Sequence, residues 1–347
     1  MPSGRRKAGS HDVAIVGAGI AGLTAARTLV DRGHDVVVLD KGRGPGGRTS
    51  SRRCEGFTFD HGAQYFTARS NLFRRQVKEW LDEGVVASWT PRLAVIESDR
   101  VRTPAKEGER HVGVPSMSAM AKRLARDLEV RSRVEVSQLS VGTEGWRVEN
   151  TAGDTVARAD VLIVAVPPAQ AVPLLTAAPE LAAQVQAVAM QPCWAVLLGF
   201  AQPVSTDFDG AFVNVGPLSW VARNASKPGR TGGEAWVLHA SATWSEQHLE
   251  DDANEVIDLL KAEFASRCCA SDLEVTVHAE AHRWRYAQPV EPLAASCLYD
   301  AVRRIGVAGD WCGGPRVEGA FLSGTALADR ILGRTADRSA ARGESDS

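Results

Sequence analysis

Short runs of consecutive aliphatic residues alternate with segments of helical periodicity near the start of the chain. Val13 to Val16 is an uninterrupted apolar run, which is typical of a strand buried on both faces of a parallel sheet. The next segment places apolar side chains on one face of a predicted helix, at Ile20, Leu23, Ala26 and Val30. Asp35 to Leu39 is a second apolar strand. This strand–helix–strand order predicts an α/β fold built on a parallel sheet.

The rest of the chain predicts further helices and strands. We expect helices at Asn71 to Asp82, at Glu246 to Ser266, and from Ser116 onward, where the serine caps a helix whose apolar face includes Leu124 and Leu128. The predicted strands are Phe57 to Tyr65, several short ones between Val85 and Val101, a pair within Val130 to Val148, and Val161 to Val166, Trp194 to Phe200, Trp236 to Ala240, Leu273 to His282 and Arg304 to Val307. A closing helix follows, with its apolar face at Val317, Ala320, Phe321, Gly324, Ala328 and Ile331.

The 347 residues of the chain exceed the size at which one hydrophobic core usually stops growing, so two domains are expected. From about Met190 the composition shifts toward tryptophan. We therefore predict a Rossmann-type nucleotide-binding domain (11–66, 105–189 and 291–334) with an interleaved α+β substrate domain (67–104 and 190–290). The polar ends, 1–10 and 336–347, are expected to be disordered tails.

Three glycines near the start have the spacing of a dinucleotide-binding turn, in the strand-to-helix context that this motif requires. Gly17 permits the tight turn, Gly19 lets backbone N–H groups approach a pyrophosphate, and Gly22 lets the helix lie close to the sheet. Asp40 follows the second strand, where a carboxylate accepts hydrogen bonds from the ribose hydroxyls of an adenosine. NAD and FAD enzymes share this motif.

The C-terminal strand, tight exit and helix favour FAD over NAD, because an NAD domain has no use for this element. In a flavoprotein, Asp310 after Gly309 can hold the ribityl-phosphate side of FAD. The positive end of the following helix then points at the flavin edge where negative charge gathers on reduction. The glycine-rich loop Gly42 to Gly47 is expected to lie over the pyrophosphate and to offer Arg48 to a phosphate.

Composition excludes several other classes of protein. Hydrophobic residues make up 44% and the net charge is −2, which predicts a globular protein without a strong field for nucleic acid or a membrane surface. The six cysteines show neither CxxC pairs nor metal-ligand spacing with histidine, so we expect a reducing cytoplasm, no disulfide scaffold and no metal.

One segment has the pattern of a leader. Arg5-Arg6-Lys7 before the apolar run Val13 to Val30 looks like a secretory or twin-arginine signal. The nucleotide-binding turn already explains that run, so we keep the cytoplasmic expectation. No uninterrupted apolar span of membrane-crossing length exists elsewhere, and we predict no membrane segment.

Several internal runs are similar to one family. RGPGGRTSS at Arg43 to Ser51, DHGAQYFTAR at Asp60 to Arg69, WVARNASK at Trp220 to Lys227, WVLHA at Trp236 to Ala240, and AHRWRYA at Ala281 to Ala287 resemble bacterial renalases. So does the C-terminal run Gly309 to Gly324, and the similarity extends from roughly Val13 to Leu332. The resemblance implies a fold similar to p-hydroxybenzoate hydroxylase and amine oxidases, with noncovalent FAD. It also implies an oxidase that converts dihydronicotinamide dinucleotides reduced at C2 or C6 to NAD(P)+ and passes the electrons to O2.

The required chemistry suggests which residues form the site. Hydride transfer from a dihydropyridine needs no general base, so positioning is the main demand. The predicted catalytic residues, which supply aromatic walls and polar partners for the carboxamide, are Gln64, Tyr65, Arg223, Asn224, His239, Trp284 and Tyr286, with Trp220 as a further candidate wall. The predicted cofactor-binding residues are Gly17, Gly19, Ile20, Ala21, Gly22, Asp40, Lys41, Gly47, Arg48, Gln64, Val134, Gly309, Asp310, Arg316, Val317, Glu318 and Ala320.

Two alternatives stay open at this point. A flavin amine oxidase has the same two ends and needs an apolar channel between paired aromatics, which Trp284 and Tyr286 allow. We rank it second because Arg223 would repel a cationic amine and fits a phosphate-bearing dinucleotide better. A binding or escort protein without flavin is third, because such a relative would have lost glycines that are all present here. The oligomeric state, the preferred isomer and the choice of NAD or NADP stay open.

Overall fold

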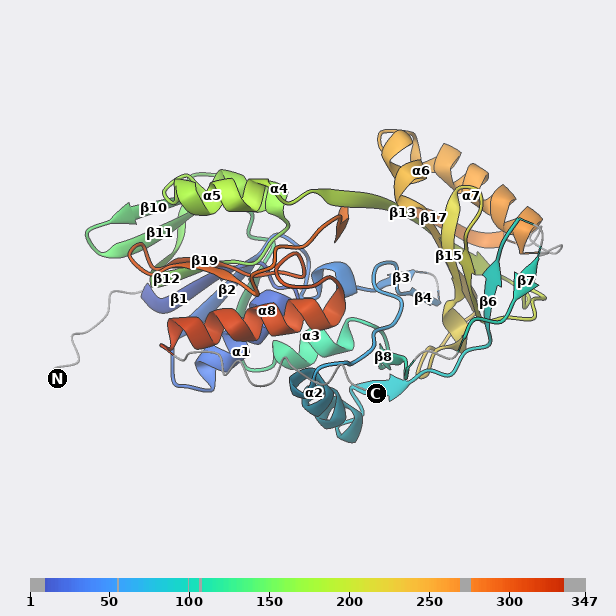
Figure 1. Cartoon of the computed structure of the whole chain (residues 1–347), viewed down its shortest axis with the longest axis horizontal. Coiled ribbons are helices and arrows are strands. Elements are labelled where there is room, and N and C mark those ends of the chain that lie inside the picture. The colour runs from blue at the N-terminus through green and yellow to red at the C-terminus, as the bar shows by residue number, and fades with distance from the viewer. Residues whose placement is uncertain (1–9, 55, 99, 106–107, 269–275, 334–347) are drawn as a thin grey trace, which may run out of the picture.

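Two β-sheets organise the chain and lie side by side in the computed structural model (Figure 1). The structure describes residues 10–333 apart from 55, 99, 106–107 and 269–275. The two predicted disordered tails therefore lie outside the described residues, except for Ser10. Among the described residues, no helix is both long enough and apolar enough to cross a membrane.

The first sheet has eight strands and contains the predicted nucleotide-binding core. Its main order is β10-β11-β12-β1-β2-β9, with β19 paired to β12 and β18 to β19. β9, β2, β1, β12 and β19 pair in parallel, whereas β10, β11 and β18 join as antiparallel neighbours. The bounds are β1 Ser10–Val16, β2 Val36–Asp40, β9 Glu129–Ser132, β10 Val136–Gly142, β11 Gly145–Asn150, β12 Thr155–Val164, β18 Leu298–Asp300 and β19 Ile305–Val307.

Helices cover both faces of this sheet because the aliphatic strands bury alternate side chains on opposite faces. Val13 and Ile15 of β1 pack in one core with α1 (Ile20–Val30), α2 (Asn71–Asp82), α3 (Ala119–Leu124) and α8 (Arg316–Ile331). Ala14 and Val16 face a second core, which is closed by the segment carrying α4 (Pro168–Ala171), η2 (Val172–Leu175) and α5 (Pro179–Gln186). The turn after β1 is thus fixed between two packed layers.

The second sheet has seven strands in the order β17-β13-β16-β15-β14-β6-β7. The bounds are β6 Leu93–Ile96, β7 Val101–Arg102, β13 Met190–Phe200, β14 Gly210–Val213, β15 Leu218–Arg223, β16 Glu234–Ala240 and β17 Thr276–Pro289. α6 (Ala242–Gln247) and α7 (Ala253–Arg267) lie on the outer side of this sheet in Figure 1, and α7 buries Val256, Leu260 and Phe264 against it. The long strands β13 and β17 reach back toward the first sheet.

Shorter elements connect the two sheets. β3 (Arg52–Cys54) and β4 (Phe57–Phe59) form a hairpin, and β5 (Val86–Ser88) pairs with β8 (His111–Gly113). The single-turn helices η1 (Gly47–Thr49) and η3 (Asn224–Ser226) follow the glycine-rich loop and β15. The α/β fold, with a Rossmann-type domain and a substrate domain, is as predicted.

Four predicted elements differ from the structure. The strand expected at Phe57 to Tyr65 ends at Phe59, and the helix expected from Glu246 to Ser266 is two helices, because Asp252 caps a new helix through a bond from the Asn254 N–H to its carboxylate. Ser116 caps no helix: α3 begins at Ala119 and ends before Leu128. The pair expected within Val130 to Val148 is formed by β10 and β11, whereas Val130 itself lies in β9, which pairs with β2 in parallel.

Candidate active site

A cavity of about 1990 Å³ extends along the edges where the two sheets meet. Pockets for single small ligands usually measure about 300–1,000 Å³, so this cavity has room for two of that size. Its lining includes the turn after β1, the glycine-rich loop, the N-terminus of α8 and the inner sides of β15, β16 and β17. Most of the predicted cofactor and substrate residues therefore meet at one cavity.

The three glycines of the first turn have distinct structural reasons. Gly17 has a φ of +109°, and a Cβ there would lie 2.5 Å from the Ala165 carbonyl oxygen. A Cβ on Gly22 would lie 2.0 Å from the Gly17 carbonyl oxygen, so Gly22 serves helix packing and does not line the cavity. A Cβ on Gly19 would have no other atom within 4 Å, and Gly19 lies on the cavity wall. A ligand can approach the backbone at Gly19.

Asp40 stiffens the neighbouring turns with its carboxylate. One oxygen accepts a 2.6 Å hydrogen bond from the Ala18 N–H, and the other accepts one of 2.6 Å from the Gly42 N–H. The side chain also lines the cavity, where an oxygen lone pair can accept from a ribose hydroxyl. One residue thus joins the glycine turn, the glycine-rich loop and the predicted adenosine site.

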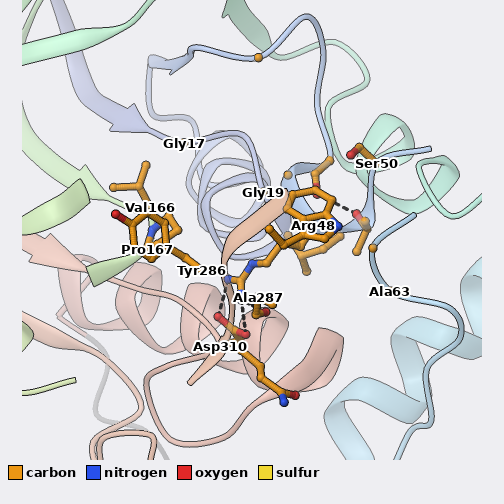
Figure 2. A pocket seen from close by; sticks show the side chains of 18 of the residues that line it. Gly17, Gly19, Arg48, Ser50, Ala63, Val166, Pro167, Tyr286, Ala287 and Asp310 are labelled. Carbon is orange, nitrogen blue, oxygen red and sulfur yellow. Dashed lines mark hydrogen bonds and ion pairs between the residues drawn. The ribbon is translucent and has the colours of Figure 1, made fainter. Parts of the chain in front are cut away.

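Arg48 does not reach out for a phosphate. Its guanidinium forms a bidentate pair with Asp310, at 2.7 and 2.6 Å, and donates a further 2.9 Å hydrogen bond to the Ala287 carbonyl (Figure 2). The Asp310 side chain is only 9% exposed, so this is a well-ordered charge-assisted contact. Arg48 therefore holds the glycine-rich loop against β17 and against the segment that follows β19. This geometry gives Arg48 a structural role instead of the predicted role as a phosphate ligand.

The N-terminus of α8 borders the cavity as predicted, with one exception. Arg316, Val317 and Ala320 line the wall. Glu318 does not line it, because its carboxylate accepts hydrogen bonds from the backbone N–H groups of Arg69 and Ser70. Glu318 thereby connects α8 to the start of α2 and is a structural residue.

Aromatic and imidazole rings from the loop after β4 and from strands β15 and β17 form the wall of the cavity on the side of the second sheet. His61 stacks on Trp284 with ring centres 5.0 Å apart, and His282 meets Trp284 edge-on at 4.3 Å. Tyr65 packs against Trp220 at 5.6 Å. These rings all line the cavity together with Tyr286. The Trp220 indole N–H is buried and has no partner among the described residues.

The carbonyl oxygen of His61 holds two of the predicted substrate residues. Trp284 Nε1 donates to it at 2.9 Å, and His239 Nε2 lies 3.1 Å away. A carbonyl only accepts, so His239 carries its proton on Nε2 and leaves Nδ1 as a hydrogen-bond acceptor. Burial lowers the pKa of His239 to about 4, and burial together with the His282 charge lowers that of His61 to about 3. Both imidazoles are neutral near pH 7.

Two predicted catalytic residues lie outside the cavity wall. Arg223 is paired with Glu234 at 2.8 Å, on the same sheet. Asn224 is fully buried and donates to the Thr58 carbonyl at 2.7 Å. Their hydrogen bonds are satisfied within the protein, so neither contacts a ligand directly in this arrangement. The strand periodicity did not reveal this, because Arg223 is the last residue of β15 and Asn224 is the first residue of η3, where the alternation of the strand ends.

Gln64 lines the cavity, but its amide group is engaged by the protein. Its nitrogen donates to the carbonyls of Asp60 and Gly62, and its oxygen accepts from Lys227 Nζ at 3.1 Å. The side chain therefore braces the loop that carries His61 and Tyr65. It orients this loop more than it offers a free donor to a ligand.

A buried ion network that the sequence does not predict lies behind this loop. Lys227 and Asp60 are both 0% exposed and lie 3.2 Å apart, and Arg230 lies 2.5 Å from the same carboxylate. Burial lowers the pKa of Lys227 to about 8, against the opposing effect of Asp60. Each residue lies in or next to a quoted family run, but no local pattern shows that they meet across 167 positions.

The residues present fit the predicted cofactor. Fifteen of the seventeen predicted cofactor-binding residues line the cavity, all except Gly22 and Glu318. The open backbone at Gly19, the Asp40 carboxylate and the N-terminus of α8 are the features expected for the pyrophosphate, the ribose and the flavin edge of FAD.

The sequence matches two known families. Residues 15–83 match the NAD(P)-binding Rossmann-like domain, and residues 96–332, more than half of the chain, match the flavin containing amine oxidoreductase family. The chain belongs to the flavin-containing amine oxidoreductase family. Membership implies a flavin cofactor and an oxidoreductase activity. It does not specify the substrate.

Curated relatives match the chain over short stretches. Hydroxyneurosporene desaturase from Rubrivivax gelatinosus is 47% identical over 60 residues, which is 17% of this chain and 11% of the relative. A 4,4'-diapophytoene desaturase from Staphylococcus haemolyticus is 48% identical over 50 residues, 14% of this chain and 10% of the relative. The matched stretch thus spans about a tenth of the length of each relative.

Solved structures match nearly the whole chain. A protein from Exiguobacterium sp. 255-15 assigned as a protoporphyrinogen oxidase superposes with a TM-score of 0.72 at 15% identity, over 94% of this chain and 100% of that chain. Putrescine oxidase bound to putrescine superposes with a TM-score of 0.68 at 16% identity, over 94% and 99%. At this level of identity the likeness shows the fold alone.

Proposed function

We propose that the protein is an FAD-dependent oxidase that converts dihydronicotinamide dinucleotides, reduced at C2 or C6, to NAD(P)+ with release of H2O2. FAD, when bound, supplies the hydride acceptor and returns the electrons to O2. The chain itself has to bind a flat ring, orient it and hold its phosphates. The cellular role would be repair of a misreduced cofactor.

The charge of the cavity wall carries this proposal. Of the residues that the structure describes, nine lysines and arginines line the cavity, against three acidic residues, Asp40, Glu135 and Asp310. All three acids lie at strand ends of the first sheet, on the expected cofactor side. Five of the cations, namely Lys41, Arg43, Arg53, Lys122 and Arg316, form no ion pair within the part of the chain that the structure describes. The excess exceeds the two negative charges of one pyrophosphate, so it favours a second phosphate-bearing ligand.

The second-sheet wall suits a neutral, flat ring. Trp284 and Tyr286 offer aromatic surface for stacking, and neutral His239 presents an acceptor for the amide N–H of a carboxamide. Among the described residues, no acidic residue from the second sheet lines the cavity to bind an ammonium group. Since a dihydropyridine loses a hydride without loss of a proton, the neutral histidines need not act as bases.

We also propose that FAD is bound noncovalently. Cys312 and His61 are the nearby candidates for a covalent link. Burial raises the pKa of the Cys312 thiol to about 12, so its reactive thiolate is scarce. Acid precipitation should leave the flavin in the supernatant. Flavin that stays with the precipitate would contradict this point alone.

A flavin amine oxidase is the second candidate. The family match and the fold shared with putrescine oxidase favour it, since both name amine oxidation and neither names a dihydronicotinamide. The aromatic walls are compatible with an amine. Against it stands the cationic lining, which repels the protonated form of an amine.

Anaerobic mixing distinguishes the two readings. The FAD-loaded protein is mixed with the 2- and 6-dihydro isomers of NAD(P)H, with NADH, and with putrescine and aromatic amines, and bleaching of the flavin is followed. We expect fast bleaching by the isomers and slow bleaching by NADH and amines. Fast bleaching by an amine and none by the isomers would assign the protein to the second candidate.

A phosphate-free substrate tests the charge argument directly. The ribosides of the same dihydronicotinamides present the same ring without phosphates. The ribosides should require a higher concentration than the dinucleotides for a half-maximal rate of flavin reduction. Added salt should weaken the binding of the dinucleotides and leave that of the ribosides unchanged. Equal behaviour of the two would refute the role of the cationic wall.

A further inference from the structure

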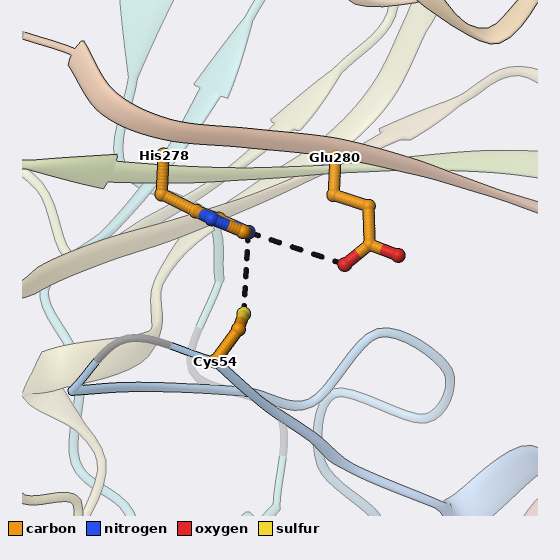
Figure 3. Close-up of side chains that lie close together, drawn as sticks. All are labelled: Cys54, His278 and Glu280. Atoms are coloured by element: carbon orange, nitrogen blue, oxygen red, sulfur yellow. Dashed lines mark hydrogen bonds and ion pairs between the residues drawn. The ribbon is translucent and has the colours of Figure 1, made fainter.

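A side-chain cluster outside the cavity brings together three different metal-ligating groups. Cys54 Sγ lies 3.2 Å from His278 Nε2, and Glu280 Oε2 lies 4.0 Å from the same nitrogen (Figure 3). All three ligand atoms lie within 4.8 Å of one another, and none of the three residues lines the cavity. We propose that this cluster is a binding site for a zinc-class divalent cation.

The distances suit a tetrahedral cation after small movements. Zinc bonds of about 2.3 Å to sulfur and about 2.0 Å to nitrogen and oxygen separate sulfur from nitrogen by about 3.5 Å and nitrogen from oxygen by about 3.3 Å. The sulfur–nitrogen distance is already within a few tenths of an ångström of this. The glutamate oxygen has to move by less than about 1 Å relative to the imidazole, which a rotation of its flexible side chain supplies.

Two separate parts of the fold hold the ligands in place. Cys54 ends β3, whereas His278 and Glu280, two residues apart on β17, point to the same face of the second sheet. The His278 ring stacks on Phe59 at 5.5 Å, which limits its rotation. Because β3 belongs to the connection from the glycine-rich loop, a bound cation would tie this connection to the substrate sheet.

The chemistry of the donors selects the class of metal. A thiolate and an imidazole favour Zn²⁺ and related transition metals, whereas Ca²⁺ and Mg²⁺ require oxygen ligands. Three protein ligands leave a fourth position for water, and the three residues are partly exposed, so a cation can enter. The sequence predicts no metal, since ligands separated by 224 positions show no recognisable spacing.

A competing ion pair makes the site adjustable. Glu280 is paired with Arg52, whose guanidinium lines the cavity. A cation bound at the cluster would take Glu280 from Arg52 and leave that guanidinium to face the cavity. Removal of Arg52 should therefore strengthen metal binding, which a nonspecific surface site would not show.

Calorimetric titration of Zn²⁺ into tag-free, FAD-loaded protein tests the proposal. The protein is first treated with a chelator, which is then removed. We expect one equivalent of Zn²⁺ to bind to the wild type, and Co²⁺ to give tetrahedral absorption bands to the red of the flavin. Cys54→Ser and Glu280→Gln should each lower the affinity for Zn²⁺ by more than the 10- to 100-fold that is typical when a hydrogen-bond partner of a metal ligand is lost. Arg52→Gln should strengthen it several-fold. Cys193→Ser, which alters another partly buried thiol, serves as the matched control and should bind as the wild type does.

Three results would overturn the inference. They are the absence of stoichiometric Zn²⁺ binding in the wild type, unchanged affinity in both ligand variants, and equal losses in the Cys193→Ser control. If Cys54→Ser does not fold, Glu280→Gln and Arg52→Gln still give opposite expected shifts. The readout is metal affinity and not turnover, so it stands whichever substrate the enzyme oxidises.

Discussion

The His61 carbonyl is the point at which the substrate wall is fixed, so loss of one of its two hydrogen bonds should be measurable. Trp284→Phe keeps an aromatic ring on the wall but removes the 2.9 Å bond from the indole N–H. A neutral hydrogen bond contributes about 0.5–1.5 kcal/mol. If that free energy orients the wall for the reaction, flavin reduction should slow by about two- to tenfold.

The assay is anaerobic stopped-flow reduction with FAD content measured in parallel. Trp146→Phe is the matched control, because Trp146 Nε1 also donates a 2.9 Å bond to a backbone carbonyl, that of Arg303, away from the cavity. This control should lower the melting temperature by a few degrees at most while the reduction rate is unchanged. Equal reduction rates in all three proteins, or equal losses in both variants, would refute the positioning role of the His61 carbonyl.

Three further predictions follow from the site and its supports. Asp40→Asn removes an acceptor from one of two backbone N–H groups and should weaken FAD by about 1–3 kcal/mol, measured as the dissociation constant of the reconstituted protein. Asp60→Asn leaves two buried cations without a carboxylate and should lower the free energy of unfolding by about 3–5 kcal/mol. Lys227→Met keeps the pair between Asp60 and Arg230 and should lower it by less. A larger loss in Lys227→Met than in Asp60→Asn would contradict this network. Burial lowers the pKa of His239 from 6.5 to about 4, so the unfolded chain binds a proton at a higher pH than the folded chain does. The free energy of unfolding of the wild type should therefore fall as the pH falls from 6.5 toward 4, and that of His239→Gln should fall less. Denaturant titrations at several pH values measure this, and the same pH dependence in both proteins would contradict it.

The sequence predicts the nucleotide-binding half well, because its signals are local. An apolar run, a glycine turn and a helical face lie within 30 residues, and each requires only its neighbours to have meaning. The β1 strand, the α1 helix and the class of fold are therefore confirmed. The break between α6 and α7 was missed, since one capping aspartate, Asp252, divides a segment of continuous helical propensity.

The site divides along the same line. Residues whose role depends on the backbone where they lie, such as Gly17, Gly19 and Asp40, are found at the cavity as the sequence predicts. Residues whose role depends on a distant partner are not predictable in this way. Arg48 pairs with Asp310 across 262 positions, and Glu318 accepts hydrogen bonds from the backbone just before α2.

The amino-acid sequence by itself determines the α/β class, the place of the glycine turn and a set of aromatic and polar candidates, because these follow from periodicity and side-chain chemistry. Only the tertiary structure decides which candidates face the cavity and which are paired with other residues of the protein, as Arg223 is with Glu234. It also decides that Cys54 meets His278 and that Lys227 meets Asp60. The physical reason is that a contact between segments far apart in the chain is fixed by the packing of the two sheets, which no local pattern encodes.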